Sequence, residues 1–297
     1  MSFLSVFRKQ SHEVASSPGE LQVELSALIA AHDAALRSGK GVLKDGPRTA
    51  VTRVRYGLGW LCVKEYRPHG LLDRIKDALR GSRARRALRG ANKLRAHGIA
   101  TPEILALAGR DGKSYLFTSF INGATPLDLL LRKRFSAALG RAEVADKRTM
   151  VRKLGRWLRR VHDLGIYHDD WSTKNILVTQ RGQGWTFHFV DVESVSSRKR
   201  LTYRRRVKNL GQISDTRFGI TRTDRMRFLL AYAGDDASLT RGSFPRDVLK
   251  ATQRRYQEYQ KVRAKARKQK ARLKRKMAKA SHITHQGSKH LAERRKR

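Results

Sequence analysis

The stretch YHDDWSTKNILV, residues Tyr167–Val178, decides how the rest of this 297-residue chain is interpreted. It follows an apolar-periodic segment ending at Leu164 and Gly165, where the glycine is a helix stop signal. Its polar middle then gives way to the aliphatic run Ile176–Val178, which is typical of a strand. We therefore expect a polar loop between a helix and a strand.

His168, Asp170 and Asn175 stand in this loop in the order H-x-D-x-x-x-x-N. That is the spacing of a kinase catalytic loop, where the aspartate accepts the proton of the attacking hydroxyl and the asparagine holds magnesium. Phosphoryl transfer needs a carboxylate directed at the nucleophile and an oxygen donor directed at a hard cation. The same residues also fit a polar loop in which Asp170 only caps the backbone, so the spacing alone leaves both interpretations open.

Two further charged residues favour the kinase interpretation. Lys64 lies within the strand-like run Trp60–Tyr66 (WLCVKEY), and a charged group in an apolar strand needs a partner. Kinases use such a lysine to hold the α- and β-phosphates of ATP. Asp191 lies near the end of the second strand pattern, Trp185–Val192 (WTFHFVDV), where a kinase places its main magnesium ligand. In order with the aspartate and asparagine of the loop, these residues predict a kinase that uses ATP and Mg²⁺.

The predicted fold class is α+β, a two-lobed protein-kinase-like fold. We expect an N-terminal arm and short helix at 1–38, an N-lobe with a small antiparallel sheet at 39–122, a mainly helical C-lobe at 123–250 and a basic tail at 251–297. The expected strands are 42–44, 49–55, 60–66, 104–108, 114–121, 176–178 and 185–192; the expected helices are 21–36, 71–95, one from about 126, 147–164, 203–212 and 223–233.

Three features depart from the protein-kinase pattern. The first turn, Asp45–Pro47, contains a single glycine, so the G-x-G-x-x-G phosphate loop is absent. The segment Leu79–His97 contains no acid, whereas a kinase helix there carries a glutamate that pairs with the strand lysine. Lys64 must then pair elsewhere, with Asp191 as one candidate, or the helix must sit differently.

The third departure follows Asp191. Glu193 stands where a D-F-G motif has glycine, and no A-P-E motif follows, which indicates that the long activation segment is missing.

The charge of the chain is extreme. With 66 Lys and Arg against 25 Asp and Glu, it carries a net +41, of which the tail from residue 251 contributes +16. Such a charge indicates polyanionic partners: nucleic acid, an anionic membrane surface or a phosphorylated glycan. Arg204–Arg206 fit either a solvated helix face or a seat for a phosphorylated or carboxylated acceptor.

The cellular compartment is predicted from cysteine use and apolar runs. Cys62 is the only cysteine, which favours a reducing compartment, and no apolar run is long enough to span a bilayer. Residues 1–10 lack the cleavage pattern of a signal peptide. We expect a cytoplasmic protein that can lie peripherally on the inner membrane.

The chain from about Val42 to Ala233 resembles the lipopolysaccharide kinase (Kdo/WaaP) family of Gram-negative bacteria. The pieces that carry the resemblance are Cys62–Tyr66, Gly98–Pro102, the loop Tyr167–Val178, Val190–Glu193 and Ile220–Tyr232 (ITRTDRMRFLLAY).

This resemblance implies transfer of the ATP γ-phosphate to a sugar hydroxyl of the lipopolysaccharide inner core, a heptose or Kdo. It implies Asp170 as the catalytic base, Lys64 as the ATP-phosphate contact, and Asn175 and Asp191 as magnesium ligands. The partners would be lipopolysaccharide core or a similar anionic glycolipid and an anionic membrane surface, with nucleic acid as a further partner of the basic tail.

Two other functions remain open. A RIO-like atypical protein kinase or ATPase shares the short catalytic core, and the tail would suit RNA-bearing partners. A non-catalytic adapter with a kinase fold could bind polyanions, although all four catalytic positions are filled. The segment Ile220–Tyr232 favours the lipopolysaccharide kinase over both.

Overall fold

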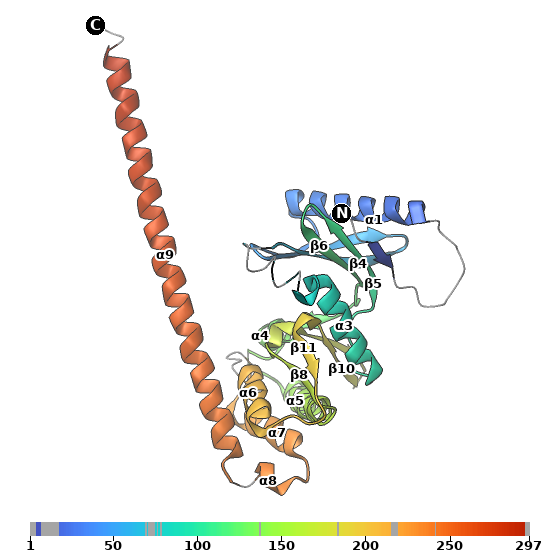
Figure 1. The fold of residues 1–297 in the computed structure, drawn as a ribbon. Coiled ribbons are helices and arrows are strands. Elements are labelled where there is room, and N and C mark those ends of the chain that lie inside the picture. Colours follow the sequence, from blue (N-terminus) through green and yellow to red (C-terminus); the bar gives the residue numbers. More distant parts are fainter. Residues whose placement is uncertain are drawn as a thin grey trace.

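A computed structural model describes residues 4–6, 18–68, 70, 75, 77, 79–136, 138–182, 184–214, 219–240 and 242–294. Its N-terminal part is built around an antiparallel sheet, its C-terminal part is mainly helical, and one long helix leaves the body (Figure 1). The predicted α+β, two-lobed kinase-like arrangement is confirmed by this layout.

The larger sheet has the strand order β1-β5-β6-β4-β3-β2. Its strands are β1 (Leu4–Val6), β2 (Val42–Gly46), β3 (Thr49–Tyr56), β4 (Gly59–Tyr66), β5 (Ile104–Arg110) and β6 (Lys113–Ser119). Helix α1 (Pro18–Ser38) lies across one face of this sheet (Figure 1) and buries Leu25, Leu28 and Ile29 against it. Because α1 covers that face, any side chain of the sheet that takes part in a reaction must lie on the opposite face.

Alternation along β4 sorts its side chains between these two faces. Leu61 and Val63 are buried in the apolar cluster under α1, whereas Cys62 and Lys64 are only partly buried on the opposite face. Cys62 and Lys64 therefore share the face that α1 does not cover. The sheet therefore presents Lys64 toward the C-terminal part.

Glu65 is a carboxylate buried under α1 among three basic side chains. Its carboxyl oxygens lie 2.6 Å from Lys113 Nζ, 2.8 Å from Arg67 Nη2 and 3.5 Å from His32 Nε2. Burial alone would raise the pKa of this carboxyl, but the hydrogen bonds from His32, Lys113 and Arg67 outweigh it and lower the pKa to about 2. The charged form of Glu65 thus stabilises the contact between α1 and the sheet.

We expect Glu65 to make the stability of the protein depend on pH. Its pKa in the folded state is below the value of 4.5 that it has when unfolded, so its contribution is complete above pH 4.5 and is lost as the pH falls toward 2. Glu65→Gln should lower the free energy of unfolding by about 3 kcal/mol at pH 7, and by less than half of that at pH 3. Urea unfolding of both variants at the two pH values measures this gap.

The control is Glu103→Gln, which removes an exposed carboxylate 3.4 Å from Arg95 and should shift stability by less than about 1 kcal/mol at either pH. A gap between wild type and Glu65→Gln that stays constant from pH 7 to pH 3 would contradict the assignment.

Helix α3 (Arg83–Ala96) packs between the sheet and the segment after Asp191. The sequence pattern predicts one helix over 71–95. Residues 75, 77, 79 and 80 are helical, but the helix is interrupted at 81–82. Helix α3 begins after this break, where the Ser82 side chain accepts a hydrogen bond from the Arg85 backbone N–H. A capping serine after a glycine starts a new helix, and that signal is missed if only basic periodicity is considered. Residues 71–74, 76 and 78 of the predicted helix lie outside the described residues.

The C-terminal part is built from further helices around two small sheets, ordered β10-β9-β7 and β11-β8. Its strands are β7 (Thr125–Pro126), β8 (Ile166–His168), β9 (Ile176–Arg181), β10 (Gly184–Phe189) and β11 (Val195–Ser197). Its helices are α4 (Leu127–Arg134), α5 (Arg141–Asp163), α6 (Tyr203–Ile213), α7 (Arg222–Ala233), α8 (Ala237–Thr240) and α9 (Phe244–Arg294), with 3₁₀ turns η1 (Thr173–Asn175) and η2 (Val192–Ser194).

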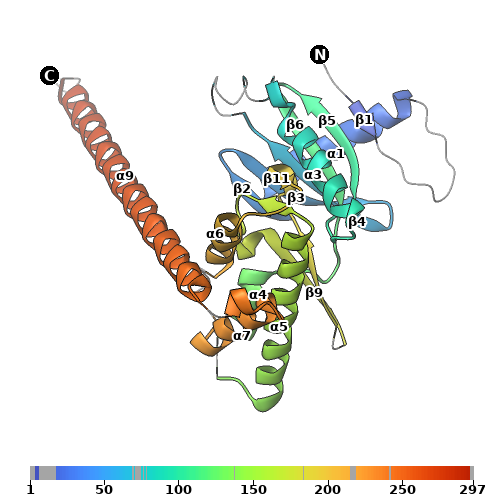
Figure 2. The same ribbon diagram turned by 60° about the horizontal axis from the view of Figure 1, so that its bottom comes forward.

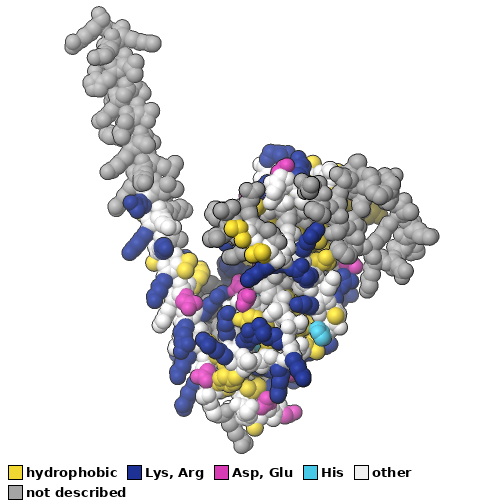
Figure 3. Space-filling view, in the orientation of Figure 1, with side chains coloured by type: hydrophobic (Ala, Val, Ile, Leu, Met, Phe, Trp, Pro, Cys, Tyr) yellow, Lys and Arg dark blue, Asp and Glu magenta, His cyan; other side chains and the backbone are white. Residues whose placement is uncertain are grey.

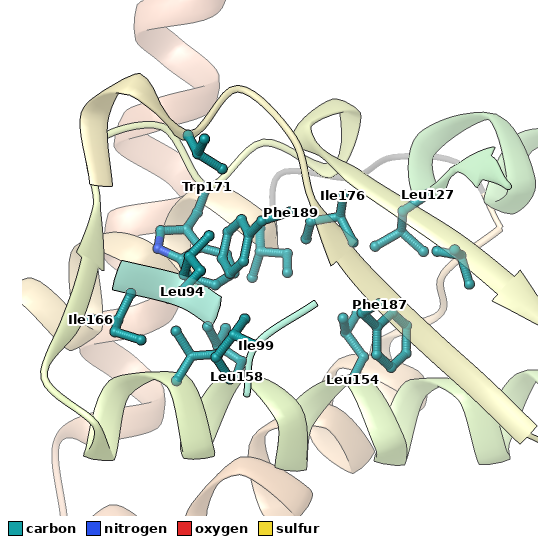
Figure 4. Packing of buried hydrophobic residues seen from close by; sticks show 14 of the residues in the cluster. Leu94, Ile99, Leu127, Leu154, Leu158, Ile166, Trp171, Ile176, Phe187 and Phe189 are labelled. Carbon is teal, nitrogen blue, oxygen red and sulfur yellow. The ribbon is translucent and has the colours of Figure 1, made fainter. Parts of the chain in front are cut away.

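Aromatic packing joins the loop Tyr167–Val178 to this core. Trp171 is fully buried and meets Phe189 edge-on, with ring centroids 4.5 Å apart, above Leu158 of α5 (Figure 4). Such a ring pair adds to the stabilisation gained from the buried area alone. Trp171 therefore anchors the loop in the core, which orients the polar residues that flank Trp171.

The segment Ile220–Tyr232 forms the start and body of α7. Thr221 caps α7 in a capping box with Asp224, which also forms a buried ion pair with Lys147 at 3.0 Å. Phe228 and Tyr232 point into the core. The described contacts of this segment are thus those of a helix anchored in the core.

Helix α9 begins at Phe244 and leaves the body beside α6 and α7 (Figures 1 and 2). Its first two turns bury Phe244 and Val248. The predicted tail begins at residue 251, but the helix starts seven residues earlier and is continuous to residue 294. None of the helices in the described ranges combines the length and apolar character that crossing a bilayer demands.

Candidate active site

Lys64 and Asp191 form an ion pair between the sheet and the C-terminal part. Lys64 Nζ lies 2.5 Å from Asp191 Oδ1, and the side chains are 14% and 31% exposed. Burial alone would lower the pKa of Lys64, but the negative charges of Asp191 and Glu193 outweigh it and raise the pKa. Burial alone would raise the pKa of Asp191, and Lys64 reverses this and lowers it. Both groups are therefore charged at neutral pH.

Lys64 therefore has an acidic partner although helix α3 carries no glutamate. The helix supplies Arg83 instead, whose Nη2 lies 2.5 Å from Glu193 Oε1 on the segment that follows Asp191. The signs of charge are thus exchanged relative to a protein kinase, with the cation on the helix and the acid after the strand. Lys64 pairs with Asp191, which was one of the two expected alternatives.

Asp191 has a left-handed backbone, with φ of 66°, which is uncommon for a residue other than glycine. Strand β10 ends at Phe189, two residues earlier, so Asp191 lies in the turn between the strand and η2. Backbone strain of this kind persists only where neighbouring contacts impose it, and it is frequent at functional sites.

His168 connects this turn to the loop Tyr167–Val178. Its Nε2 lies 3.0 Å from the Asp191 carbonyl oxygen, and its Nδ1 accepts a hydrogen bond of 3.1 Å from the Asp170 backbone N–H. These two bonds fit the neutral ring with its proton on Nε2. His168 thereby sets the position of Asp170 relative to Asp191.

Asp170 and Asn175 lie together at the surface of the loop. Asn175 Nδ2 donates to the Asp170 backbone oxygen at 3.1 Å and lies 3.4 Å from Asp170 Oδ2. The backbone N–H of Val190 donates to the Asn175 carbonyl oxygen at 3.0 Å, so Asn175 is adjacent to the turn that holds Asp191. The structure thus brings all four predicted residues into one region between the two lobes.

The oxygen donors of this region suit magnesium. Asn175 points its amide nitrogen at Asp170, which leaves Oδ1 for a cation, and Asp191 supplies a carboxylate from the adjacent turn. Mg²⁺ prefers one or two such protein oxygens and completes its shell with water and phosphate. Within the described ranges no three His, Cys, Asp or Glu side chains gather as a metal site.

Helix α6 holds the loop through two buried amides that the sequence analysis did not single out. Asn209 Nδ2 donates to the His168 carbonyl oxygen at 2.9 Å, and Gln212 Nε2 donates to the Asp169 carbonyl oxygen at 2.7 Å. Gln212 Oε1 accepts from the Trp171 backbone N–H at 3.2 Å. The sequence pattern that could have indicated Asn209 and Gln212 is a pair of amide residues three positions apart on one helix, beside the apolar Leu210 and Ile213.

Comparison with known proteins finds a matching family model and similar solved structures. A family model for the lipopolysaccharide kinase (Kdo/WaaP) family matches residues 47–232. The solved structure of WaaP in complex with acyl carrier protein is similar at 20% identity and a TM-score of 0.50, over 71% of this chain and 88% of that chain. At that identity the likeness shows the fold alone.

Two structures of the Mycobacterium tuberculosis PknI kinase domain, one of them a double mutant, match at 16% and 19% identity with TM-scores of 0.39 and 0.43. They cover 60% and 69% of this chain and 72% and 87% of those chains. A search of curated proteins finds no match. Because the family model spans more than half of the chain, this phosphotransferase belongs to the lipopolysaccharide kinase (Kdo/WaaP) family.

Proposed function

We propose that the protein transfers the γ-phosphate of ATP to a sugar hydroxyl of the lipopolysaccharide inner core, a heptose or Kdo. The observation that carries this proposal is the exposed carboxylate of Asp170, held beside Asn175 on a loop that His168 joins to the Lys64–Asp191 pair. This arrangement supplies a base, a cation site and a phosphate contact in one region, as phosphoryl transfer requires.

Each side chain has a distinct role in the proposed reaction. Lys64 exchanges its contact with Asp191 for the phosphates of ATP, and Asp191 and Asn175 would hold Mg²⁺. When bound, the cation neutralises the charge that develops on the phosphates. Asp170 takes the proton of the sugar hydroxyl as its oxygen bonds to the γ-phosphorus, while the bond from that phosphorus to the bridging oxygen breaks and ADP leaves.

The surface charge favours an anionic acceptor at a membrane. Lys and Arg side chains are spread over the described part of the face seen in Figure 3 and continue along the described part of α9. A positive field of this kind attracts an anionic glycolipid and a leaflet of acidic lipid. We infer a cytoplasmic enzyme that works peripherally on the inner membrane, with the basic tail as the part of the chain that could also bind nucleic acid.

The test is phosphate transfer from γ-labelled ATP with Mg²⁺ to three acceptors offered separately. These are core lipopolysaccharide stripped of phosphate, a generic protein, and RNA-bearing ribosomal particles. We expect label on the glycan, at a rate that falls when Mg²⁺ is chelated. Label only on protein, or ATP hydrolysis stimulated by the particles, would favour a RIO-like enzyme instead.

A further inference from the structure

Helix α9 places an arginine on the candidate catalytic carboxylate. Arg255 Nη2 donates to Asp170 Oδ1 at 2.7 Å, and the two side chains are 37% and 52% exposed. Arg255 lies beyond residue 232, where the match to the family model ends. The active-site region therefore includes an element that the family match does not cover.

The position of Arg255 is fixed by the packing of α9 on α6. A Cβ built on Gly211 would lie 2.7 Å from the Ala251 Cβ, so the two helices approach as closely as a glycine allows. Tyr203 donates its hydroxyl proton to Asp247 Oδ2 at 2.7 Å. Arg255 follows Ala251 by four residues, which places it on the same side of α9, one turn further along.

The same helix α6 also carries the loop that holds Asp170, through Asn209 and Gln212. The loop that carries Asp170 and the helix that carries Arg255 therefore both pack on α6. This shared support keeps the two residues close together.

An arginine that stayed on the base would work against catalysis. The guanidinium occupies Asp170 Oδ1, one of the two oxygens that could take the proton of an acceptor hydroxyl, and it stands where that hydroxyl would have to approach. The Arg255 Nε and Nη1 donors have no hydrogen-bond partner among the residues that the structure describes. An arginine fork with free donors at a surface is suited to bind a phosphate or carboxylate with two parallel bonds.

Further positive charge lies on α6 near the loop. Lys208 Nζ is 3.9 Å from Asp169 Oδ1, and the Arg205 guanidinium lies 5.1 Å from the centre of the Tyr167 ring. Both belong to α6, the helix on which α9 packs. An uncharged acceptor would gain little from this cluster, whereas an anionic acceptor would be drawn to Asp170 by it.

We propose that Arg255 is an acceptor-binding residue, an inference that rests on the proposed function above. Without acceptor its guanidinium contacts Asp170. With acceptor bound it contacts a phosphate or carboxylate next to the reacting hydroxyl, which releases Asp170 Oδ1 to take the proton. Helix α9 is then one wall of the acceptor site, and Arg255 selects acceptors that already carry negative charge.

The experiment is steady-state kinetics of the full chain with two acceptors: core lipopolysaccharide stripped of phosphate, which keeps its carboxylates, and core lipopolysaccharide that keeps phosphate on sugars other than the acceptor. Arg255→Ala should raise the acceptor KM by about 10- to 100-fold and leave the KM for ATP unchanged. Arg255→Lys should recover part of this loss. Arg254→Ala, which removes the same charge from the neighbouring exposed position, is the matched control and should change KM by less than about threefold.

The two acceptors identify the anionic group. An effect on both assigns a carboxylate, and an effect only on the second assigns a phosphate. Equal effects of Arg255→Ala and Arg254→Ala would overturn the proposal, and so would a higher kcat with an unchanged acceptor KM, which would show that Arg255 only restrains Asp170. If the wild type itself transfers phosphate to neither acceptor, the proposed function fails, and this inference fails with it.

Discussion

In the Asp170→Asn variant we expect kcat for phosphate transfer to fall about a thousandfold, which is within the range for loss of a general base. Asparagine keeps the size of the side chain and an oxygen that can accept from Asn175 and Arg255, so the loop should keep its geometry. The amide oxygen is too weak a base to take the proton of a sugar hydroxyl. Initial rates with γ-labelled ATP and saturating acceptor give the loss, and thermal unfolding confirms the fold.

The neighbouring carboxylate is the control for this substitution. Asp169 is 68% exposed, and its Oδ1 lies 3.9 Å from Lys208 Nζ. It is one residue from Asp170, so Asp169→Asn removes the same charge from the same loop, and we expect kcat within about threefold of wild type. If Asp170→Asn retained a tenth of the wild-type kcat, Asp170 would not be the base.

The second large effect is expected from Gly90→Ala, in the middle of α3. A Cβ built on Gly90 would lie 1.9 Å from the Val192 carbonyl oxygen, and a contact that short forces one of the two backbones to move. We expect the free energy of unfolding to fall by about 3 kcal/mol, the upper range for overpacking. Because Val192 follows Asp191 directly, we also expect the KM for Mg²⁺-ATP to rise.

Gly59→Ala is the matched control for this glycine. Its nearest neighbour would be the Tyr56 carbonyl oxygen at 3.8 Å, an ordinary contact, and the site is exposed. Urea unfolding should find it within about 0.5 kcal/mol of wild type. A Gly90→Ala protein with unchanged stability and unchanged KM would show that the approach of α3 to Val192 is not rigid.

The order of the elements and the four candidate site residues could be predicted because each leaves a local signal. Lys64 interrupts an apolar strand, Asp170 and Asn175 keep a fixed spacing, and Asp191 follows a strand pattern. Most helices and strands lie within a few residues of their predicted bounds, because their apolar periods are clear. The catalytic roles of these four residues stay predictions.

The pairings between distant segments could not be predicted in the same way. Nothing near Arg83 in the sequence indicates Glu193, 110 residues away, and nothing near Asp170 indicates Arg255, 85 residues away. Such contacts depend on how helices dock, and helix docking is set by small residues such as Gly90 and Gly211 whose role appears only when the partner backbone is in place.

The burial of Phe244 and Val248 means that the packed core of this protein extends beyond the last residue that the family model matches. The family match stops at residue 232, yet Phe244 stacks on Tyr232 with ring centroids 6.0 Å apart and is 1% exposed, and Val248 is 2% exposed. A fragment cut at the family boundary would leave Tyr232 and the Gly211 face of α6 uncovered, and would forfeit about 1.5–3 kcal/mol for each buried side chain lost. We therefore expect a fragment that keeps the first turns of α9 to be more stable than one that ends at residue 232.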